Sequence, residues 1–290
     1  MIRPLLDDAA IDREDQELVA LVRDGNRDAL DRLIRRHQRW IYNIVVRMLY
    51  WPHDAEDVTQ EILVKVITKL SSFEGRSSFR TWLYRIAVNH VLNTERDRSA
   101  QWNFVRYGEG LDGAPDAELP DPSPGADAML MEEESKITCT SGMLLCLDRR
   151  QRLVFILGEI LGVTDVVGAE LLEVSRDNFR QLLARARRDL YAFMNDKCGL
   201  VNTANPCRCA KKTQAFIDAG YVDPKRLVFV QIHSKRMKEL AGPIHDGLER
   251  LDVAYGEIYR NHAFYDAPDF VESLRALISD PQFRTILEGT

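Results

Sequence analysis

A long helical periodicity dominates the first third of this 290-residue sequence. From Glu14 to Asn103, glycine and proline are sparse and apolar residues recur at intervals of three and four. This spacing places the apolar side chains on one face of an α-helix. Breaks at Gly25 and at Trp51–Pro52 divide the pattern into several helices. The pattern predicts a small all-α domain over residues 1–102.

The composition changes abruptly after residue 103. Four prolines and four glycines occur between Gly108 and Gly125, and no apolar period is present. Nine acidic residues lie between Glu109 and Glu134, with no lysine or arginine among them. Such a segment has little apolar surface to bury. We therefore expect residues 103–136 to form an acidic, flexible linker.

A second helical unit is expected over residues 137–196. Within it, a short helix near Asp165–Leu171, a turn at Leu172–Val174 and a long helix from Ser175 to about Met194 fit a helix-turn-helix. Two residues depart from that motif. Glu173 occupies the turn where glycine is common, and Gly168 lies on the face that should pack against the second helix.

Residues 197–290 form an extension that begins with a cysteine-bearing loop. Cys198, Cys207 and Cys209 could supply three thiolates to zinc, with Cys139, Cys146 or a histidine as a fourth ligand; the candidate histidines are His233, His245 and His262. A redox-responsive thiol cluster and unreactive cysteines remain as alternatives. The odd total of five cysteines disfavours a disulfide framework.

Composition narrows the classes of function. A net charge of −6 disfavours an autonomous, non-specific nucleic-acid binder but leaves room for local basic faces. The acidic amino terminus and the absence of long apolar runs predict a cytoplasmic protein without a membrane partner. No catalytic or nucleotide-binding motif is present, so we do not expect an enzyme or a required cofactor.

Aromatic and arginine side chains alternate in the segment FEGRSSFRTWLYRIAVN, residues 73–89. Aromatic rings can stack on unpaired bases while arginines hold phosphates. The glycine and serines predict a loop whose backbone could approach an extruded base. Alternatively, Phe79, Trp82 and Leu83 belong to the hydrophobic core, and for Trp82 both interpretations stay open.

Two further clusters have both a structural and a functional interpretation. Acidic residues at 54–61 form either a solvated helix face or a docking surface for a basic partner helix. Basic and amide residues open the long helix at residue 175, where they either solvate the surface or read base edges in the major groove.

Taken together, these segments resemble the extracytoplasmic-function family of RNA polymerase sigma factors. ELVALVRDGNRDAL at 17–30 and RHQRWIY at 36–42 are similar to the start of that family's region two. DAEDVTQEILVKV at 54–66 resembles its polymerase-binding helix, and residues 73–89 resemble its melting and minus-ten segment. Residues 175–190 resemble its minus-thirty-five recognition helix, and the last ninety or so residues lie outside the family's minimal form.

The resemblance implies a role for each cluster. The expected contacts to the core RNA polymerase are Asp54, Glu56, Asp57 and Gln60. The expected contacts to the single-stranded minus-ten element are Phe73, Arg76, Ser77, Arg80, Trp82, Arg85 and Asn89. The expected contacts to the minus-thirty-five duplex are Arg176, Asn178, Arg180, Gln181 and Arg185. The linker would act as a polyanion that occupies a nucleic-acid channel, and an anti-sigma factor is a further expected partner.

Other hypotheses remain. The chain could be a helix-turn-helix regulator that works without polymerase, although such a regulator does not need the acidic helix at Asp54. Residues 211–290 could hold an enzyme or ligand-binding module, but they carry no chemical signature of one. We expect the extension to be a regulatory module that occludes or stabilises the two conserved domains.

Overall fold

The computed structural model describes residues 9–96, 98–117, 126–227, 229, 258–259, 265 and 267–279. All regular structure in these ranges is helical, which confirms the predicted all-α class. The chain divides into two compact units, which are described separately. The first unit comprises residues 1–97, 156–181 and 266–290, and the second comprises residues 98–155 and 182–265.

Four helices form the main body of the first unit: α1 (Ala9–Arg23), α2 (Arg27–Leu49), α3 (Pro52–Thr68) and α4 (Phe79–Asn93). Local sequence fixes their ends. Gly25, in the turn between α1 and α2, has φ +85°. Asn26 then caps α2 by accepting a 3.0 Å hydrogen bond from the amide of Ala29. Proline at the first position of α3 suits a helix start.

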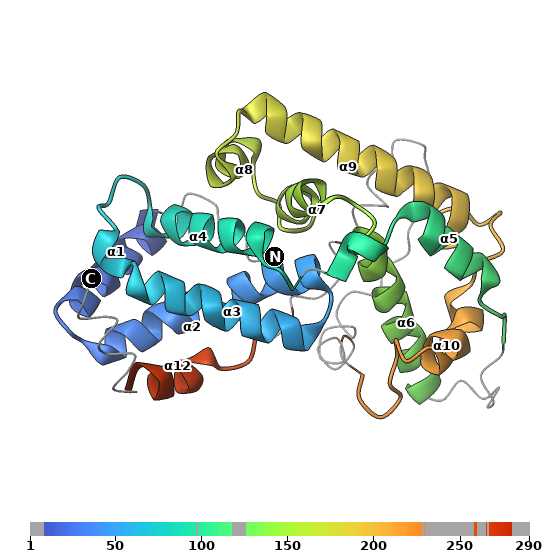
Figure 1. Cartoon of the computed structure of the whole chain (residues 1–290), viewed down its shortest axis with the longest axis horizontal. Helices are drawn as coiled ribbons and strands as arrows, with labels where there is room; N and C mark the ends of the chain where they lie inside the picture. The colour runs from blue at the N-terminus through green and yellow to red at the C-terminus, as the bar shows by residue number, and fades with distance from the viewer. Residues whose placement is uncertain are drawn as a thin grey trace. The chain divides into compact units, whose positions relative to one another are not determined.

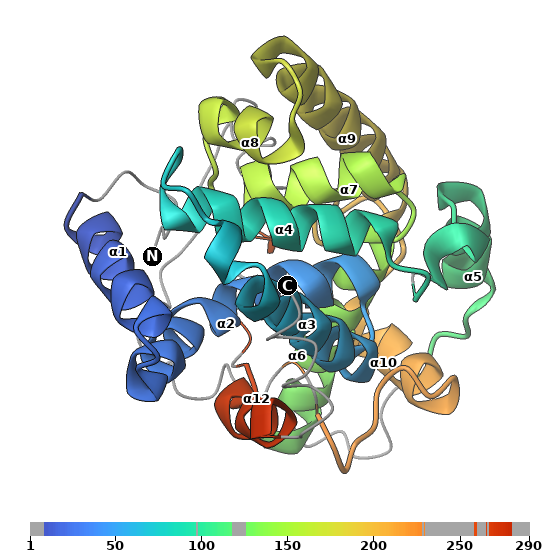
Figure 2. The same ribbon diagram turned by 60° about the vertical axis from the view of Figure 1, so that its left-hand side comes forward.

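Helices α2, α3 and α4 pack against one another, and α1 covers α2 and α4. Figures 1 and 2 both show α4 lying alongside α3. The hydrophobic core that joins these helices contains the fully buried side chains Ile41, Ile44, Ile62, Phe79 and Val88. This core holds the facing surfaces of α3 and α4 in a fixed relation.

The first unit also contains α8 and the first turns of α9, which form the predicted helix-turn-helix. Helix α8 spans Asp165–Leu172 and α9 begins at Arg176, close to the predicted bounds. The two unusual residues have physical explanations. A Cβ on Gly168 would collide with the ring of Phe179, and Glu173 ends α8 in the left-handed conformation, with φ 54°.

The helix α12 (Phe270–Ser279) brings part of the C-terminal extension into the first unit. It packs on α2 and α3, and Figure 1 shows it running alongside α2. Phe270, Val271 and Leu274 are buried, and the Arg35 guanidinium lies 2.6 Å from the Asp269 carboxylate.

The second unit contains α5 (Phe104–Gly113), α6 (Ala126–Leu144), α7 (Arg149–Phe155), the later turns of α9, which ends at Lys197, and α10 (Cys209–Asp218). Helices α6 and α10 pack together. Arg152 is buried and donates hydrogen bonds of 3.1–3.3 Å to three carbonyls, those of Leu144, Leu145 and Leu147. It thereby satisfies carbonyl groups at the end of α6.

The structure differs from the predicted linker over residues 103–136. Residues 104–113 and 126–136 are helical, and residues 118–125 lie outside the described ranges. Asn103 caps α5 through a 2.9 Å hydrogen bond from the amide of Arg106, and Gly108 allows α5 to approach Phe193 and Lys197. Packing thus fixes a helix in a segment that has almost no apolar periodicity.

Candidate nucleic-acid interface

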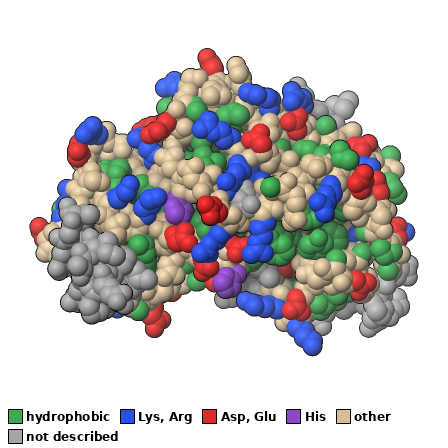
Figure 3. Space-filling model, viewed as in Figure 1, with side chains coloured by type: hydrophobic (Ala, Val, Ile, Leu, Met, Phe, Trp, Pro, Cys, Tyr) green, Lys and Arg blue, Asp and Glu red, His purple; other side chains and the backbone are tan. Residues whose placement is uncertain are grey.

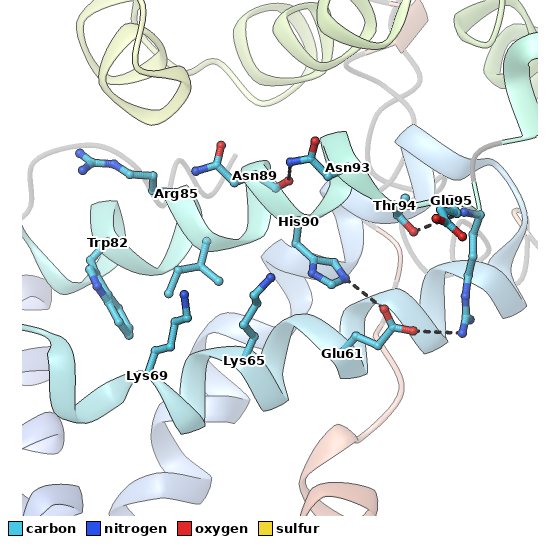
Figure 4. Close-up of a pocket in the computed structure, with 12 residues that line it drawn as sticks. Glu61, Lys65, Lys69, Trp82, Arg85, Asn89, His90, Asn93, Thr94 and Glu95 are labelled. Carbon is cyan, nitrogen blue, oxygen red and sulfur yellow. Dashed lines mark hydrogen bonds and ion pairs between the residues drawn. The ribbon is translucent and has the colours of Figure 1, made fainter. Parts of the chain in front are cut away.

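A groove of about 800 Å³ runs between α3 and α4 in the first unit. Figure 4 shows Lys65 on α3 and Lys69 at its C-cap pointing toward α4, whereas Trp82 on α4 points toward α3. The groove is lined by Glu61, Lys65, Lys69, Trp82, Arg85, Ile86, Asn89, His90, Asn93, Thr94, Glu95 and Arg96. Three of the residues predicted to contact the minus-ten strand, namely Trp82, Arg85 and Asn89, are therefore brought together.

The groove combines the three kinds of group that hold an unpaired strand. Lys65 and Lys69 supply positive charge for phosphates, and the half-buried indole of Trp82 supplies a surface for stacking. Asn89 is exposed, and its amide can form paired hydrogen bonds with a base edge. Asn93 lies one turn further along α4 and donates a 2.7 Å hydrogen bond to the carbonyl of Asn89.

One end of the groove is fixed by a network of ion pairs. His90 Nε2 lies 3.0 Å from Glu61 Oε2, and Arg96 pairs with both Glu61 and Asp57 (Figure 4). The carboxylate of Asp57 raises the pKa of Arg96. Figure 3 accordingly shows basic and acidic side chains interspersed over this face of the molecule. The groove is therefore lined by both basic and acidic side chains.

Two of the residues predicted to contact the minus-ten strand, Phe73 and Arg80, are buried in the first unit. Phe73 is 5 % exposed and packs edge-on against Phe79, with ring centroids 5.5 Å apart. The Arg80 guanidinium donates hydrogen bonds of 2.8 and 3.0 Å to the carboxylate of Asp12, and its side chain is 5 % exposed. Both residues therefore belong to the interior of the first unit, and the ring of Phe73 packs against that of Trp82, which lines the groove.

Arg76 and Ser77 lie in the loop before α4. Gly75 there has φ +73°, a conformation that glycine adopts without strain. Arg76 is highly exposed and forms an ion pair with Glu74, while Ser77 is half-buried. Ser78 caps α4 by accepting a 3.1 Å hydrogen bond from the amide of Thr81. The loop is thus anchored at its end and open to solvent at Arg76.

The four residues predicted to meet the core RNA polymerase lie on α3. Glu56 is exposed, whereas Asp54, Asp57 and Gln60 are half-buried. Asp57 is shared between Arg96 and His53, whose Nδ1 lies 3.7 Å away. A basic partner must therefore exchange with Arg96 to reach the Asp57 carboxylate.

The residues predicted to read the upstream duplex share one exposed side of α9: Arg176, Asn178, Arg180, Gln181 and Arg185. Ser175 fixes the start of the helix by accepting a 3.2 Å hydrogen bond from the amide of Asn178. Arg180 pairs with Asp165 on α8. The opposite side carries the buried residues Phe179, Ala186 and Leu190. Helix α9 therefore has one apolar, buried side and one polar, exposed side, as a recognition helix does.

Sequence reasoning missed Lys65, Lys69 and Asn93 as members of this interface. The feature of the sequence that could have indicated these residues is their spacing. Glu61 and Lys65 on α3 and Lys69 at its C-cap follow one another at intervals of four, as do Arg85, Asn89 and Asn93 on α4. Such spacing places each set on one side of its helix.

Cys198, Cys207 and Cys209 lie at the end of α9 and the start of α10, and all five cysteines are free. The candidate ligands His233, His245 and His262 lie outside the described residues. Within the described residues, no helix combines the length and the apolarity that a bilayer crossing requires.

Among solved structures, the chain matches "Structure of CnrH in complex with the cytosolic domain of CnrY" with a TM-score of 0.46 and 23% identity. The match covers 63% of this chain and 98% of that chain.

Sequence comparisons identify the family. The family described as Sigma-70 region 2 matches residues 33–101. RNA polymerase sigma-H factor of Pseudomonas aeruginosa is 41% identical over 80 residues, which is 28% of this chain and 42% of that relative. The ECF RNA polymerase sigma-E factor of Escherichia coli is 31% identical over 179 residues, 60% of this chain and 90% of that relative. The chain therefore belongs to the extracytoplasmic-function (ECF) family of RNA polymerase sigma factors.

Proposed function

We propose that this chain is an RNA polymerase sigma factor that directs promoter recognition, strand opening and transcription initiation. The observation that carries the proposal is the α3–α4 groove, in which lysines, an indole and an exposed asparagine amide line one track. A duplex-binding regulator has no use for a track of this kind. The relatives are named as sigma factors, which are not enzymes.

Strand capture follows from the groove's chemistry. Lys65 and Lys69 attract the phosphates, Trp82 stacks on a base, and Asn89 reads a base edge. Stacking of a base on an aromatic ring contributes about 1–3 kcal/mol, which is comparable to the few kcal/mol needed to unpair and unstack one nucleotide. The groove therefore stabilises a strand that is already opening.

Association with the core RNA polymerase would use the acidic side of α3. Glu56 and Asp57 present negative charge to a basic partner helix, which speeds encounter and fixes orientation. The polymerase then supplies most of the positive charge that DNA binding requires, and the net charge of −6 is compatible with the role. An anti-sigma partner remains a prediction.

Register on the promoter would come from α9. Arg176 and Arg180 suit guanine, Asn178 and Gln181 suit adenine, and Arg185 lies further along toward the phosphates. All five side chains are exposed. The ion pair between Arg180 and Asp165 must open or rotate if Arg180 is to contact a base.

The acidic segment and the extension are proposed to regulate access. Exposed acids such as Glu109, Asp112 and Glu132 can occupy a positively charged channel, but Glu134 cannot, because it is buried and accepts a 2.8 Å hydrogen bond from the amide of Phe229. Helix α12 covers apolar surface of α2 and so stabilises the body that carries the groove.

The test is transcription on a library of promoters from the host, with purified core polymerase. Start sites that depend on this chain support the proposal, and their absence from every promoter counts against it. Replacing Arg176 by alanine should relax upstream selectivity by about 1–3 kcal/mol at one base pair. Tight binding of duplex by the isolated chain, without stimulation of polymerase, would favour the helix-turn-helix regulator instead.

A further inference from the structure

The first helix of the helix-turn-helix packs on the helix that carries the groove. Helices α8 and α4 contact each other within the first unit, and Figure 1 shows them side by side. A turn of π-helix at Ile156–Ile160, which precedes α8, contacts both α8 and α2. The side chains of Ile156 and Leu157 in this turn are fully buried. The segment 156–181 thus contacts the body that carries the groove at two places.

Two carboxylates of the helix-turn-helix hold the guanidinium of Arg85. Arg85 Nη2 lies 3.4 Å from Glu170 Oε1 on α8, and Arg85 Nη1 lies 3.7 Å from Glu173 Oε1 at the C-cap of α8. Figure 4 shows the Arg85 side chain on α4 pointing away from α3. Arg85 is one of the residues predicted to contact the minus-ten strand. Its guanidinium therefore pairs with carboxylates of this chain where a strand would offer phosphates.

The unusual residue in the turn supplies one of these carboxylates. Glu173 has φ 54° and ψ 45°, a left-handed conformation that costs glutamate more than glycine. A glycine would end α8 as well, but it has no side chain that could reach Arg85. The ion pair with Arg85 is thus a specific consequence of glutamate at position 173.

The two ion pairs are suited to reversible opening. The side chains of Arg85, Glu170 and Glu173 are 35%, 46% and 63% exposed, and ion pairs with such exposure are weak and screened by salt. Among the described residues, no atom accepts a hydrogen bond from the buried Nε–H of Arg85. A phosphate can accept two parallel hydrogen bonds from one guanidinium. A phosphate that displaces the carboxylates can therefore also accept from Nε.

The contact between α8 and α4 is incompatible with the binding of both promoter elements at once. The minus-ten and minus-thirty-five elements lie roughly 25 base pairs apart, which is about 85 Å along the duplex. Arg176, the first residue of α9, follows Glu173 by three residues, and three residues span at most about 11 Å. While Glu173 is held at Arg85, the recognition helix must start close to α4. The helix-turn-helix must therefore leave α4 before α9 can bind upstream.

We propose that Glu170 and Glu173 form an acidic latch on Arg85, which keeps the free chain closed and withholds this arginine from the minus-ten strand. The inference rests on the proposed function, which assigns α4 and α9 to the two promoter elements. In the complex with the core polymerase the latch is open, because both elements are bound there. A free chain with a closed latch competes poorly for single-stranded DNA.

The first test compares two double variants of the full-length chain. Glu170→Gln with Glu173→Gln removes the latch, whereas Glu17→Gln with Glu272→Gln removes two negative charges from exposed sites on α1 and α12. Without polymerase, the latch variant should bind a single-stranded minus-ten oligonucleotide roughly two- to tenfold more tightly than the wild type. The control variant should bind as the wild type does at physiological salt, because distant exposed charges are screened.

The same titrations with the core polymerase present should give equal affinities for the wild type and both variants, because the latch is then already open. Equal affinities of the three free chains for the oligonucleotide overturn the proposal. Weaker binding by the free latch variant also overturns it, since the two glutamates would then help to hold the strand.

The second test needs neither DNA nor polymerase, so it separates failure of the latch from failure of the proposed function. Hydrogen exchange of the free chains, followed by mass spectrometry, reports how often α4 and α8 separate. The latch variant should exchange roughly two- to tenfold faster than the wild type in α8, and the control variant should not. Unchanged exchange contradicts the latch even if the chain directs transcription. Faster exchange in a chain that directs none supports the latch and refutes the proposed function alone.

Discussion

The backbone of Gly168 lies directly against the ring of Phe179, so that a Cβ atom at position 168 would lie 2.9 Å from Cδ2 and closer still to Cε2. Phe179 is itself buried. The first helix of the helix-turn-helix thus rests on a side chain of the recognition helix, and the smallest residue sets the distance between them.

Gly168→Ala should therefore destabilise the protein. Overpacking of a well-filled contact costs about 1–3 kcal/mol, which denaturant titration of the free energy of unfolding would measure. Gly110→Ala is the matched control, because Gly110 also lies in a helix but has open space around it. The control should be neutral or slightly stabilising, and equal effects of the two substitutions would contradict the packing account.

Lys65 and Lys69 should contribute to binding of unpaired DNA through phosphate contacts. Removing one such contact should lower the slope of log affinity against log salt by about 0.7 for a single strand. Titrations of the polymerase complex with a single-stranded oligonucleotide at several salt concentrations would measure this slope for Lys65→Ala and Lys69→Ala. Lys225→Ala, at an exposed lysine outside the groove, should leave the slope unchanged. If all three variants behave alike, the groove does not hold the phosphates.

Leu274 should anchor α12 to the first unit, because its side chain is 0% exposed. Leu274→Ala removes buried methyl groups and should lower the free energy of unfolding by about 2–5 kcal/mol. Glu272→Ala on the exposed side of the same helix should change it by less than about 0.5 kcal/mol. Denaturant titration distinguishes the two, and a neutral Leu274→Ala would show that α12 does not stabilise the unit.

The free energy of unfolding should fall in alkaline solution because the thiol of Cys146 is largely buried. Burial raises the pKa of the Cys146 thiol to about 12, whereas a cysteine thiol in an unfolded chain has a pKa of about 8.5. Between these values the unfolded chain loses the proton and the folded chain keeps it, so stability falls as pH rises, by up to about 1.4 kcal/mol per pH unit. Below about pH 8.5 the thiol is protonated in both the folded and the unfolded chain, so its contribution to the free energy of unfolding is fully present.

The comparison that isolates this thiol is wild type against Cys146→Ser, unfolded at pH 8 and at pH 10. The wild type should lose up to about 2 kcal/mol more than the variant over this interval. Identical losses would mean that the thiol titrates normally in the folded chain.

Much of the fold was accessible from the sequence because its helices are strongly amphipathic. Periodicity in residues 14–103 predicts the helices of the first domain, and the turn before Ser175 predicts the helix-turn-helix. Helix α5 was missed because its packing depends on Phe193, which lies far from α5 in the sequence and meets it only in the folded chain. The N-cap at Asn103 was the one local signal of that helix.

The site was predicted less completely, because composition does not distinguish a ring that stacks on a base from one that fills the interior. Phe73 and Trp82 have similar surroundings in the sequence, yet Phe73 is buried and Trp82 lines the groove. Arg80 turns inward because Asp12, 68 positions earlier, accepts its hydrogen bonds. Pairings over such sequence distances become visible only once the fold is known.

The central claim is that the α3–α4 groove holds an unpaired promoter strand when the chain is bound to polymerase. The direct measurement is the affinity of that complex for a single-stranded minus-ten oligonucleotide, with wild type and Asn89→Ala compared. We predict weaker binding by about 1–3 kcal/mol for the variant, with unchanged association to the core polymerase. Equal affinity of both complexes for the oligonucleotide would contradict the account.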